Sequence, residues 1–402
     1  MLAVKSVKQR YQPSGEILRL LETFRCMVNE TLQTGLSYGA CSLKRLSCLS
    51  YRRLRRYDSP SCYKLCAISR AAGILSARKK SLRRGIRTRD PYSLKPVLTA
   101  YQGFKVQDGE LRIPVGQRRF QVIRLTNHTA SVLSDKSLRV RSFTLTGSFL
   151  SLCISKEVRE VGCTGTVGVD RNLRNLTVGN EYRTVQYDLS KSVRIAETTA
   201  EIVGSFKRND VRVRRVIASK YGQRRRERTL RLLHNVTRQI VTRALREKQA
   251  IVLENIEGIR RLYRRGNGQG SMYRRRMNGW RFSEAQRQLE YKARWVGLPV
   301  IRLSRRETRG TSVTCPQCGE RLQEDKRLWR KLWCRKCRVM MDRDVVASLN
   351  LSRRGRLRFD RSRVRTGPEG GAVEAVKGNP TTTVIPGVDA PKSGISVQQP
   401  KT

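Results

Sequence analysis

Acidic residues are scarce in this sequence, and long apolar runs are missing. The 402 residues include 85 Lys and Arg but only 32 Asp and Glu, so the formal net charge is +53. A charge of this size repels itself in a compact fold unless a polyanion neutralises it. A solvated basic surface needs no such excess, because small net charges suffice for solubility. The composition therefore predicts a nucleic-acid partner, held mainly through its phosphates.

Segments that would place the chain in or across a membrane are also missing. No stretch approaches the roughly 18 consecutive apolar residues of a membrane span. The first residues, MLAVKSVKQRYQ, have no apolar core of the length that a secretion signal needs. We therefore expect a cytoplasmic protein without a membrane partner. Without a secretion signal, the eleven cysteines indicate thiols and metal ligands rather than disulfides.

Four of these cysteines form two closely spaced pairs. The pairs are Cys315-Pro-Gln-Cys318, followed by Gly319, and Cys334-Arg-Lys-Cys337. Two such knuckles close a tetrahedral cage of thiolates, which satisfies Zn²⁺ and leaves no open position. The pattern predicts a structural zinc site. Reduced cysteines without metal and an iron–sulfur cluster are the alternatives. The other seven cysteines share no spacing and are expected to be small buried hydrophobic residues.

The order of patterns along the chain predicts several regions. Leu2 to Gln12 alternates like a strand, Ser14 is a helix N-cap candidate, and an apolar helical stripe begins at Ile17. Strand patterns occupy about 93–156, with a hairpin signal at Asp108-Gly109. We interpret these strands and the first strand as a small antiparallel barrel that carries the helical lobe as an insert.

The second half alternates strands and helices. Residues 192–248 have a helical pattern, with expected breaks near Asp210 and at Tyr221-Gly222. A basic run at 224–228 and a basic, tyrosine-bearing loop at 260–276 either contact phosphates or are only solvated. After Leu351 the composition shifts towards Gly, Pro, Thr and Ser, which is typical of disorder.

Three carboxylates stand out against the basic background. Asp170 and Glu254 each follow a buried apolar strand, and Asp344 opens a helical pattern; Asp342 competes with Asp344 for this place. Three clustered carboxylates repel one another unless a cation lies among them. Two divalent ions about 4 Å apart can activate water and stabilise the leaving oxygen of a phosphodiester. Oxygen ligands favour Mg²⁺ or Mn²⁺ over Zn²⁺ here.

Three blocks of the sequence carry a family resemblance. VGVDRNLRNLTVG, IVLENIEGI and CRKCRVMMDRDVVASLNL resemble the three RuvC motifs of the TnpB (OrfB) proteins of insertion sequences, and more distantly the type V CRISPR nucleases. GWRFSEAQRQLEYKARWVGLPV and TSVTCPQCG fit the family as well. The resemblance is specific from about residue 161 to 351. It is weaker over the first 160 residues. Arg171 departs from the pattern, because many relatives have a small or apolar residue there.

The resemblance implies a fold, an activity and partners. The implied fold class is α/β plus β-barrel, with an RNase H-like (RuvC) nuclease domain. The implied activity is metal-dependent, RNA-guided DNA cleavage in a prokaryotic cytosol, by a chain expected to be a monomer with guide RNA and double-stranded target DNA as partners. Carried over by motif, Asp170, Glu254 and Asp344 are the catalytic Mg²⁺ or Mn²⁺ ligands. Asp344 is preferred to Asp342 because its spacing matches the family.

The implied organisation has five parts: a wedge-like β-barrel (1–13 and 88–160), a helical recognition lobe (14–87), a RuvC-like nuclease domain (161–310 and 341–352), a zinc-ribbon insert (311–340) and a disordered tail (353–402). Two other functions agree with part of the sequence. A nuclease-inactive guided DNA binder or repressor would need the charge and the cysteines but not the three acids. A strand-transfer transposase would need the acids but would join DNA ends rather than only cut them.

Overall fold

The computed structural model describes residues 1–116, 119–206, 210–256, 263, 266–324, 328 and 330–364. The described chain divides into two compact units. The N-terminal unit contains residues 4–156, and the C-terminal unit contains residues 157–364 together with the first three residues. In the described residues, no helix is both long enough and apolar enough to cross a membrane.

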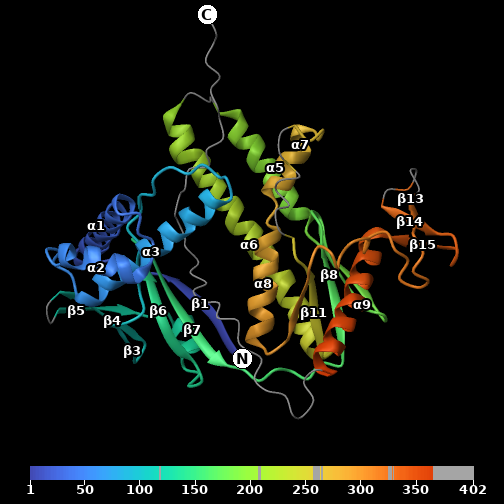
Figure 1. The fold of residues 1–402 in the computed structure, drawn as a ribbon, viewed down its shortest axis with the longest axis horizontal. Helices are drawn as coiled ribbons and strands as arrows, with labels where there is room; N and C mark the ends of the chain where they lie inside the picture. Colours follow the sequence, from blue (N-terminus) through green and yellow to red (C-terminus); the bar gives the residue numbers. More distant parts are fainter. Residues whose placement is uncertain are drawn as a thin grey trace, which may run out of the picture. The chain divides into compact units, whose positions relative to one another are not determined.

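The N-terminal unit combines a helical segment with two antiparallel sheets (Figure 1). Its elements are β1 (Leu2–Arg10), α1 (Gly15–Ser37), α2 (Leu43–Leu54), α3 (Ser61–Arg83), β2 (Leu98–Ala100), β3 (Lys105–Gln107), β4 (Glu110–Gly116), β5 (Arg119–Arg124), α4 (Asn127–Leu133), β6 (Arg139–Leu145) and β7 (Phe149–Glu157). The three helices therefore follow the first strand and precede all the others. One hydrophobic core joins α1, α2 and α3 to strands of both sheets.

Local sequence signals explain several boundaries in this unit. The Ser14 hydroxyl accepts a hydrogen bond from the Ile17 N–H and caps α1, as the sequence predicts. Asp108 and Gly109 join β3 to β4 with φ angles of 49° and 73°. Positive φ at both central residues is what a tight type I′ hairpin requires, and Asp-Gly is a preferred pair for it. The predicted hairpin is therefore present.

The strands of this unit pair differently from the predicted single barrel. Hydrogen-bonded neighbours form a four-stranded sheet in the order β1-β7-β6-β2 and a separate three-stranded sheet, β3-β4-β5. A sequence pattern shows which residues are strands, but it does not show which strands pair, because pairing depends on contacts between distant segments. The two sheets are joined by their shared core rather than by one continuous ladder.

The C-terminal unit is built around a five-stranded mixed sheet in the order β10-β9-β8-β11-β12. Its elements are β8 (Gly165–Arg171), β9 (Asn175–Gly179), β10 (Thr184–Asp188), α5 (Ser190–Ser205), η1 (Val213–Ile217), α6 (Ala218–Arg246), β11 (Gln249–Glu254), α7 (Ser271–Gly279), α8 (Phe282–Trp295), β12 (Val300–Leu303), β13 (Gln323–Glu324), β14 (Lys331–Cys334), β15 (Val339–Asp342) and α9 (Arg343–Val364). The prediction of a mixed α/β domain is confirmed.

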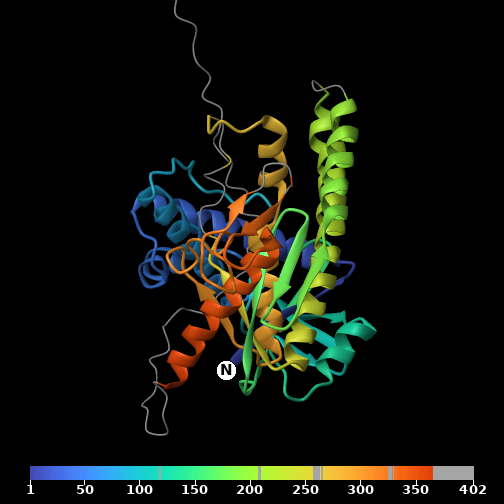
Figure 2. The same cartoon turned by 90° about the vertical axis from the view of Figure 1, so that its right-hand side faces the viewer.

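The two faces of this sheet are covered by different helices (Figures 1 and 2). Val167 and Val169 of β8 belong to the core that also includes residues of α6 and α8. Side chains alternate along a strand, so the residues between them face the other way. The Thr166 hydroxyl donates a hydrogen bond to the Ser352 carbonyl of α9 at 2.8 Å. The sheet therefore lies between α9 on one face and α6 with α8 on the other.

Helix α9 packs unusually close to the sheet because two glycines leave room for it. A β-carbon at Gly168 would lie 2.1 Å from the Ser348 carbonyl oxygen, and one at Gly355 would lie 2.2 Å from a methyl group of Val252. At Gly168 the obstacle is backbone, which cannot move aside like a flexible side chain; at Gly355 it is the branched side chain of Val252, which is fully buried and has little freedom to move. Both positions therefore require glycine for this packing. This close contact fixes the position of the whole helix on β8 and β11.

The structured chain extends further than the sequence predicts. A disordered tail was expected from residue 353, but α9 continues to Val364. Arg354 donates hydrogen bonds to the Glu307 and Arg309 carbonyls, and Arg358 donates one to the Arg302 carbonyl. These contacts hold residues 353–360 against the domain, which explains why composition alone misplaced the boundary. The remaining tail, residues 365–402, lies outside the described residues.

Candidate functional site

Two of the three predicted acids converge at one edge of the mixed sheet. Strands β8 and β11 are parallel neighbours, and the last residues that pair between them are Val169 and Leu253. Asp170 and Glu254 are the next residues on the two strands, so they lie side by side at the strand ends. Val252, two residues before Glu254, contacts α9 through Gly355. Because side chains alternate, both acids face the side of the sheet that α9 covers.

The third predicted acid reaches this edge from α9. The Asp344 side chain lies in the first turn of α9 and is 4% exposed. The neighbouring Asp342 has a different place: its carboxylate accepts hydrogen bonds from the Asp344 and Val345 N–H groups, at 2.9 and 3.4 Å. Asp342 therefore caps the helix. The geometry separates the two acids that the sequence leaves in competition.

Two asparagines connect the acid of β8 with the acid of α9. The Asn172 amide donates to the Asp170 carboxylate at 2.7 Å and to the Asn175 side-chain oxygen at 3.2 Å. The Asn175 amide in turn donates to the Asp344 carboxylate at 3.3 Å. Asn172 lies in the turn between β8 and β9, and Asn175 is the first residue of β9. They form a polar bridge that holds Asp170 and Asp344 at the same edge.

An arginine from the cysteine-bearing insert completes the network. The Arg330 guanidinium donates hydrogen bonds to the carboxylate of Asp344 and to the side-chain oxygen of Asn172. The Arg330 backbone has a φ of 63°, in the left-handed region that arginine rarely adopts. Its carbonyl accepts a hydrogen bond from the Arg343 N–H at 2.9 Å. The start of α9 therefore holds Arg330 in this conformation.

A second arginine positions the acid of β11. Arg171 is 4% exposed, and its guanidinium donates to the Gln286 side chain of α8 at 2.8 Å and to the backbone carbonyl of Glu254. Burial lowers the pKa of Arg171 to about 10, which leaves it charged at neutral pH. Arg171, the residue at which the chain departs from the family pattern, is thus a buried cation. It links the end of β8 to the end of β11 next to the acids.

The electrostatics of the site reflect its burial and its charges. Burial raises the pKa of Asp170 to about 6, and the neighbouring Glu254 carboxylate adds to this rise. The hydrogen bond from Asn172 and the charge of Arg330 act in the opposite direction. A carboxyl group that is costly to ionise and lies beside another carboxylate is a typical cation ligand.

The carboxylates suit a hard divalent cation by their chemistry, since all their donor atoms are oxygens. In this structure, however, the oxygens of the three carboxylates do not lie as close together as the ligands of one metal ion. In the part of the chain that the structure describes, the four cysteines are the one group of acidic, histidine or cysteine side chains close enough to hold a metal ion. Arg330 supplies the positive charge beside Asp344 in this arrangement.

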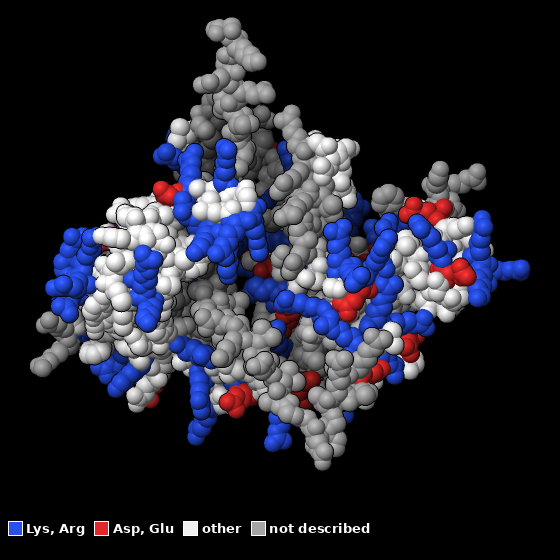
Figure 3. Space-filling model, viewed as in Figure 1, with Lys and Arg blue, Asp and Glu red and all other residues white. Residues whose placement is uncertain are grey.

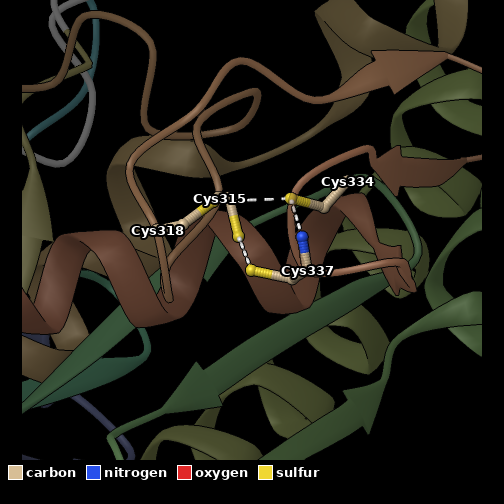
Figure 4. A group of neighbouring side chains, drawn as sticks. All are labelled: Cys315, Cys318, Cys334 and Cys337. Carbon is tan, nitrogen blue, oxygen red and sulfur yellow. Dashed lines mark hydrogen bonds between the residues drawn. The ribbon is translucent and has the colours of Figure 1, made fainter.

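The four predicted zinc ligands come together in the insert between β12 and α9 (Figure 4). All four sulfur atoms lie within 4.8 Å of one another. Cys315 and Cys337 are 3.9 Å apart, and Cys318 and Cys334 are 3.5 Å apart, measured between sulfurs. A tetrahedral ion with Zn–S bonds of about 2.3 Å places its sulfurs about 3.8 Å apart. The cluster therefore fits a tetrahedral thiolate site.

Both pairs of cysteines sit in the same kind of tight turn. The residue after each pair has a positive φ: 78° at Gly319 and 53° at Arg338. The Gly319 N–H donates to the Cys315 carbonyl at 3.0 Å, and the Cys337 N–H donates to the Cys334 sulfur at 3.4 Å. Gly319 was expected to support such a turn, and here arginine takes the equivalent place in the second one.

A buried amide of α9 also attaches the insert to the sheet, in addition to the contacts of Arg330. The Asn350 side chain of α9 donates to the carbonyls of Thr311 and Thr314, at 2.8 and 2.7 Å. Thr314 directly precedes Cys315. The helix that carries Asp344 thus also holds the first cysteine turn in place.

The sequence identified the acids and the cysteines, but not the side chains that connect them. Asn172, Asn175, Thr308 and Arg330 were missed; the Thr308 hydroxyl donates to the Glu254 carboxylate at 3.3 Å. Their only local signal is that the asparagines lie two and five residues after Asp170, in and just after the turn that follows β8. Residues 260–262, 264 and 265 of the predicted basic loop at 260–276 lie outside the described residues, and its last part, from Ser271, belongs to helix α7 rather than to a loop. Lys and Arg nevertheless outnumber Asp and Glu on the face shown in Figure 3.

Comparison with known sequences finds similar proteins for the part of the chain that contains the site. Residues 282–351, which contain α8, the cysteine insert and Asp344, match the model of the Cas12f1-like TNB domain. A TnpB-like protein of Methanocaldococcus jannaschii is 28% identical over 270 residues, which cover 62% of this chain and 91% of that protein. The resemblance to TnpB is thereby confirmed by sequence.

Comparison with solved structures supports the fold. The chain is similar to the protein in the Cas12f1–sgRNA–target DNA complex, with a TM-score of 0.55 and 13% identity over 84% of this chain and 82% of that one. Together, these findings show that the chain is similar to a TnpB-like protein and shares the fold of the protein in the Cas12f1 complex.

Proposed function

We propose that this chain is an RNA-guided DNA endonuclease that cuts phosphodiester bonds at one RuvC-like site. The observation that carries the proposal is the convergence of Asp170, Glu254 and Asp344 at one sheet edge, in a chain similar to TnpB-like proteins. The net charge of +53 supports nucleic acid as the substrate and partner. Guide RNA and double-stranded DNA are the proposed partners, by analogy with Cas12f1.

The three acids are the proposed ligands of Mg²⁺ or Mn²⁺. When bound, such ions activate water and stabilise the leaving oxygen of a phosphodiester. The chain's own residues prepare this site. Asn172 and Asn175 orient two of the carboxylates, and Arg171 fixes the strand end that carries Glu254. Arg330 offsets the charge of Asp344 and can turn towards a phosphate, because its side chain is 35% exposed.

The four cysteines are the proposed ligands of one structural Zn²⁺ ion. Their sulfur spacing and the two matching turns support zinc, and a four-thiolate cage leaves no open position for catalysis. The role of the ion would be to hold the ribbon, and hence Arg330, against α9. Asn350 supports the same contact from the other side.

The test is to co-express the chain with the DNA that flanks its gene downstream, and to sequence the RNA that co-purifies. Cleavage of a plasmid that carries the matching target is then measured in Mg²⁺. Asp344→Asn should abolish cleavage, by at least about a hundredfold, while the bound RNA stays the same. Asp342→Asn is the matched control, because asparagine is also a good N-cap and should leave cleavage within a few-fold of wild type.

Other outcomes would point to other functions. One discrete bound RNA without cleavage would indicate a guided DNA binder or repressor. Joined rather than cut DNA ends would indicate a strand-transfer transposase. A mixture of cellular RNAs without cleavage would indicate a general basic binder. Equal loss of cleavage in Asp342→Asn and Asp344→Asn would contradict the assignment of the third acid.

A further inference from the structure

Helix α6 carries a straight line of cations on its solvent side. The line, which we name the α6 stripe, repeats every three or four residues and is exposed throughout: it contains the cations Lys220, Arg224, Arg228, Arg231, Arg238 and Arg246, with the neutral Asn235 and Thr242 at the two intervening positions. The buried residues of α6 are Thr229, Leu233, Thr237, Ile240, Val241 and Ala244. At 3.6 residues per turn, these lie on the opposite side of the helix from the stripe.

The stripe is longer and straighter than a local patch. Its 26 residue steps correspond to about 39 Å along the helix axis. Helix α6 is continuous over Ala218–Arg246 and stands beside α5, as Figure 2 shows. The expected break at Tyr221-Gly222 is absent, so the basic run at 224–228 lies within the helix rather than in a loop. The cations therefore project from one rigid rod.

The charges of the stripe have one sign, which a merely solvated helix face does not need. Lys220, Arg224 and Arg228 are spaced by four residues, where like charges repel each other. Elsewhere on the same helix, Arg243 pairs with Glu247 at 2.8 Å. Within the described residues, Arg246 is the only stripe cation with a carboxylate in ion-pair range, at 4.0 Å from Glu247. The repulsion along the stripe is relieved when a linear polyanion lies against it.

We propose that the α6 stripe binds the phosphodiester backbone of an extended single strand of nucleic acid, an inference that rests on the proposed function. A single strand can run along the rod and meet its cations in succession. Each strand of a duplex winds around the duplex axis, so its backbone contacts a straight row of cations only where the strand crosses that row. RNA and DNA share the phosphate chemistry, so the experiment distinguishes between them.

The experiment measures how binding depends on salt. The full-length Asp344→Asn chain, freed of RNA in high salt, is titrated with fluorescent 30-nucleotide single-stranded RNA, the same DNA and a 30-base-pair duplex, without divalent ions. The test variant combines Arg224→Gln, Arg228→Gln and Arg231→Gln. Three lost contacts should reduce the slope of log Kobs against log salt by about 2 for a single strand, at about 0.7 per phosphate.

Two controls separate charge from structure. The same three positions changed to Lys keep the charge and should keep the slope. A second control removes the same charge from other exposed positions of the C-terminal unit, with Arg183→Gln, Lys191→Gln and Arg194→Gln. Its slope should stay within about half a unit of wild type. Circular dichroism should show unchanged helix content and melting for the Gln variant, since it removes only exposed, mutually repelling side chains.

The outcomes decide the inference without reference to cleavage. A slope loss on single strands, restored by Lys, supports it; loss with RNA alone or DNA alone identifies the strand. An unchanged slope in the Gln variant, an equal loss in the Lys variant, or a loss confined to the duplex overturns it. If the Gln variant loses slope but the wild-type chain never cleaves a guided target, the inference about the stripe holds and the proposed nuclease function is wrong.

Discussion

Arg330 donates a hydrogen bond to the carboxylate of Asp344, so that a cation from the cysteine insert meets an acid from the sheet domain. Asp344 is nearly buried, and a buried carboxylate is stable only with a compensating charge or metal. Since α9 fixes the Arg330 backbone through the Arg343 N–H, the pairing is part of the local fold. The insert therefore acts on the candidate site directly, although it carries none of the three acids.

Replacement of Arg330 by alanine should destabilise the C-terminal unit in the absence of divalent ions. Loss of one partner of a buried ion pair costs about 3–5 kcal/mol, and the 35% exposure of Arg330 reduces this to about 1–3 kcal/mol. Urea unfolding without divalent ions measures the change, and added Mg²⁺ should recover part of it. Arg335→Ala, an exposed arginine of the same insert, is the control. Equal stability of the two variants would contradict a role for the pair.

Zinc removal should disturb both the insert and the site. Elemental analysis of the purified chain should give one zinc per chain, and Cys315→Ser should lose it, because a three-thiolate site binds the ion more weakly. The variant should melt at a lower temperature and cleave more slowly, since Arg330 loses its support. Cys48→Ser changes an exposed thiol outside the cluster and should change neither property. Full stability of the metal-free wild-type chain would exclude a structural ion.

The packing of α9 on the sheet should be sensitive to one methyl group. Gly168→Ala places a β-carbon 2.1 Å from the Ser348 carbonyl oxygen and 2.6 Å from the Ser352 nitrogen, so α9 must shift. We expect a loss of about 1–3 kcal/mol in the free energy of unfolding and reduced cleavage, because Asp344 moves with the helix. Gly204→Ala in α5 meets nothing within 4 Å and should stabilise by up to about 1 kcal/mol. Equal free energies of unfolding for Gly168→Ala and Gly204→Ala would contradict this account of the packing.

Truncation should separate the contribution of the last turns of α9 from that of residues 365–402. A chain that stops after Val364 keeps the contacts of Arg354, Gly355 and Arg358 with the domain and should cleave like the full chain. A chain that stops after Ser352 loses these contacts and should melt at a lower temperature. Thermal melting and cleavage of both products test this. A stable, active chain ending at Ser352 would show that the last turns of α9 contribute nothing.

Residues with strong local signals could be predicted from the sequence. Asp170 and Glu254 follow apolar strands, and parallel neighbours bring such strand ends together. The cysteine pairs have a spacing with few structural interpretations. The hairpin at Asp108-Gly109 and the Ser14 cap also depend on a few adjacent residues, which is why these predictions agree with the structure.

Features that depend on distant contacts could not be predicted in this way. Arg330 lies 14 residues from Asp344 and reaches it only because the insert folds back on α9. Gly222 indicated a break, yet α6 continues through it, since a single glycine costs only about 1 kcal/mol and the long helix has other contacts. The N-terminal strands were identified, but their division into two sheets depends on pairing that no local pattern records.

Helix α9 carries Asp344, covers the sheet and anchors the first cysteine turn through Asn350. During synthesis on the ribosome, Asp170 and Glu254 emerge well before this helix. A nascent chain therefore cannot assemble the three acids until the start of α9 has been translated. If the proposed function holds, a messenger cut short before residue 343 would yield a basic polypeptide that lacks the third carboxylate, and such a product would bind nucleic acid without cutting it.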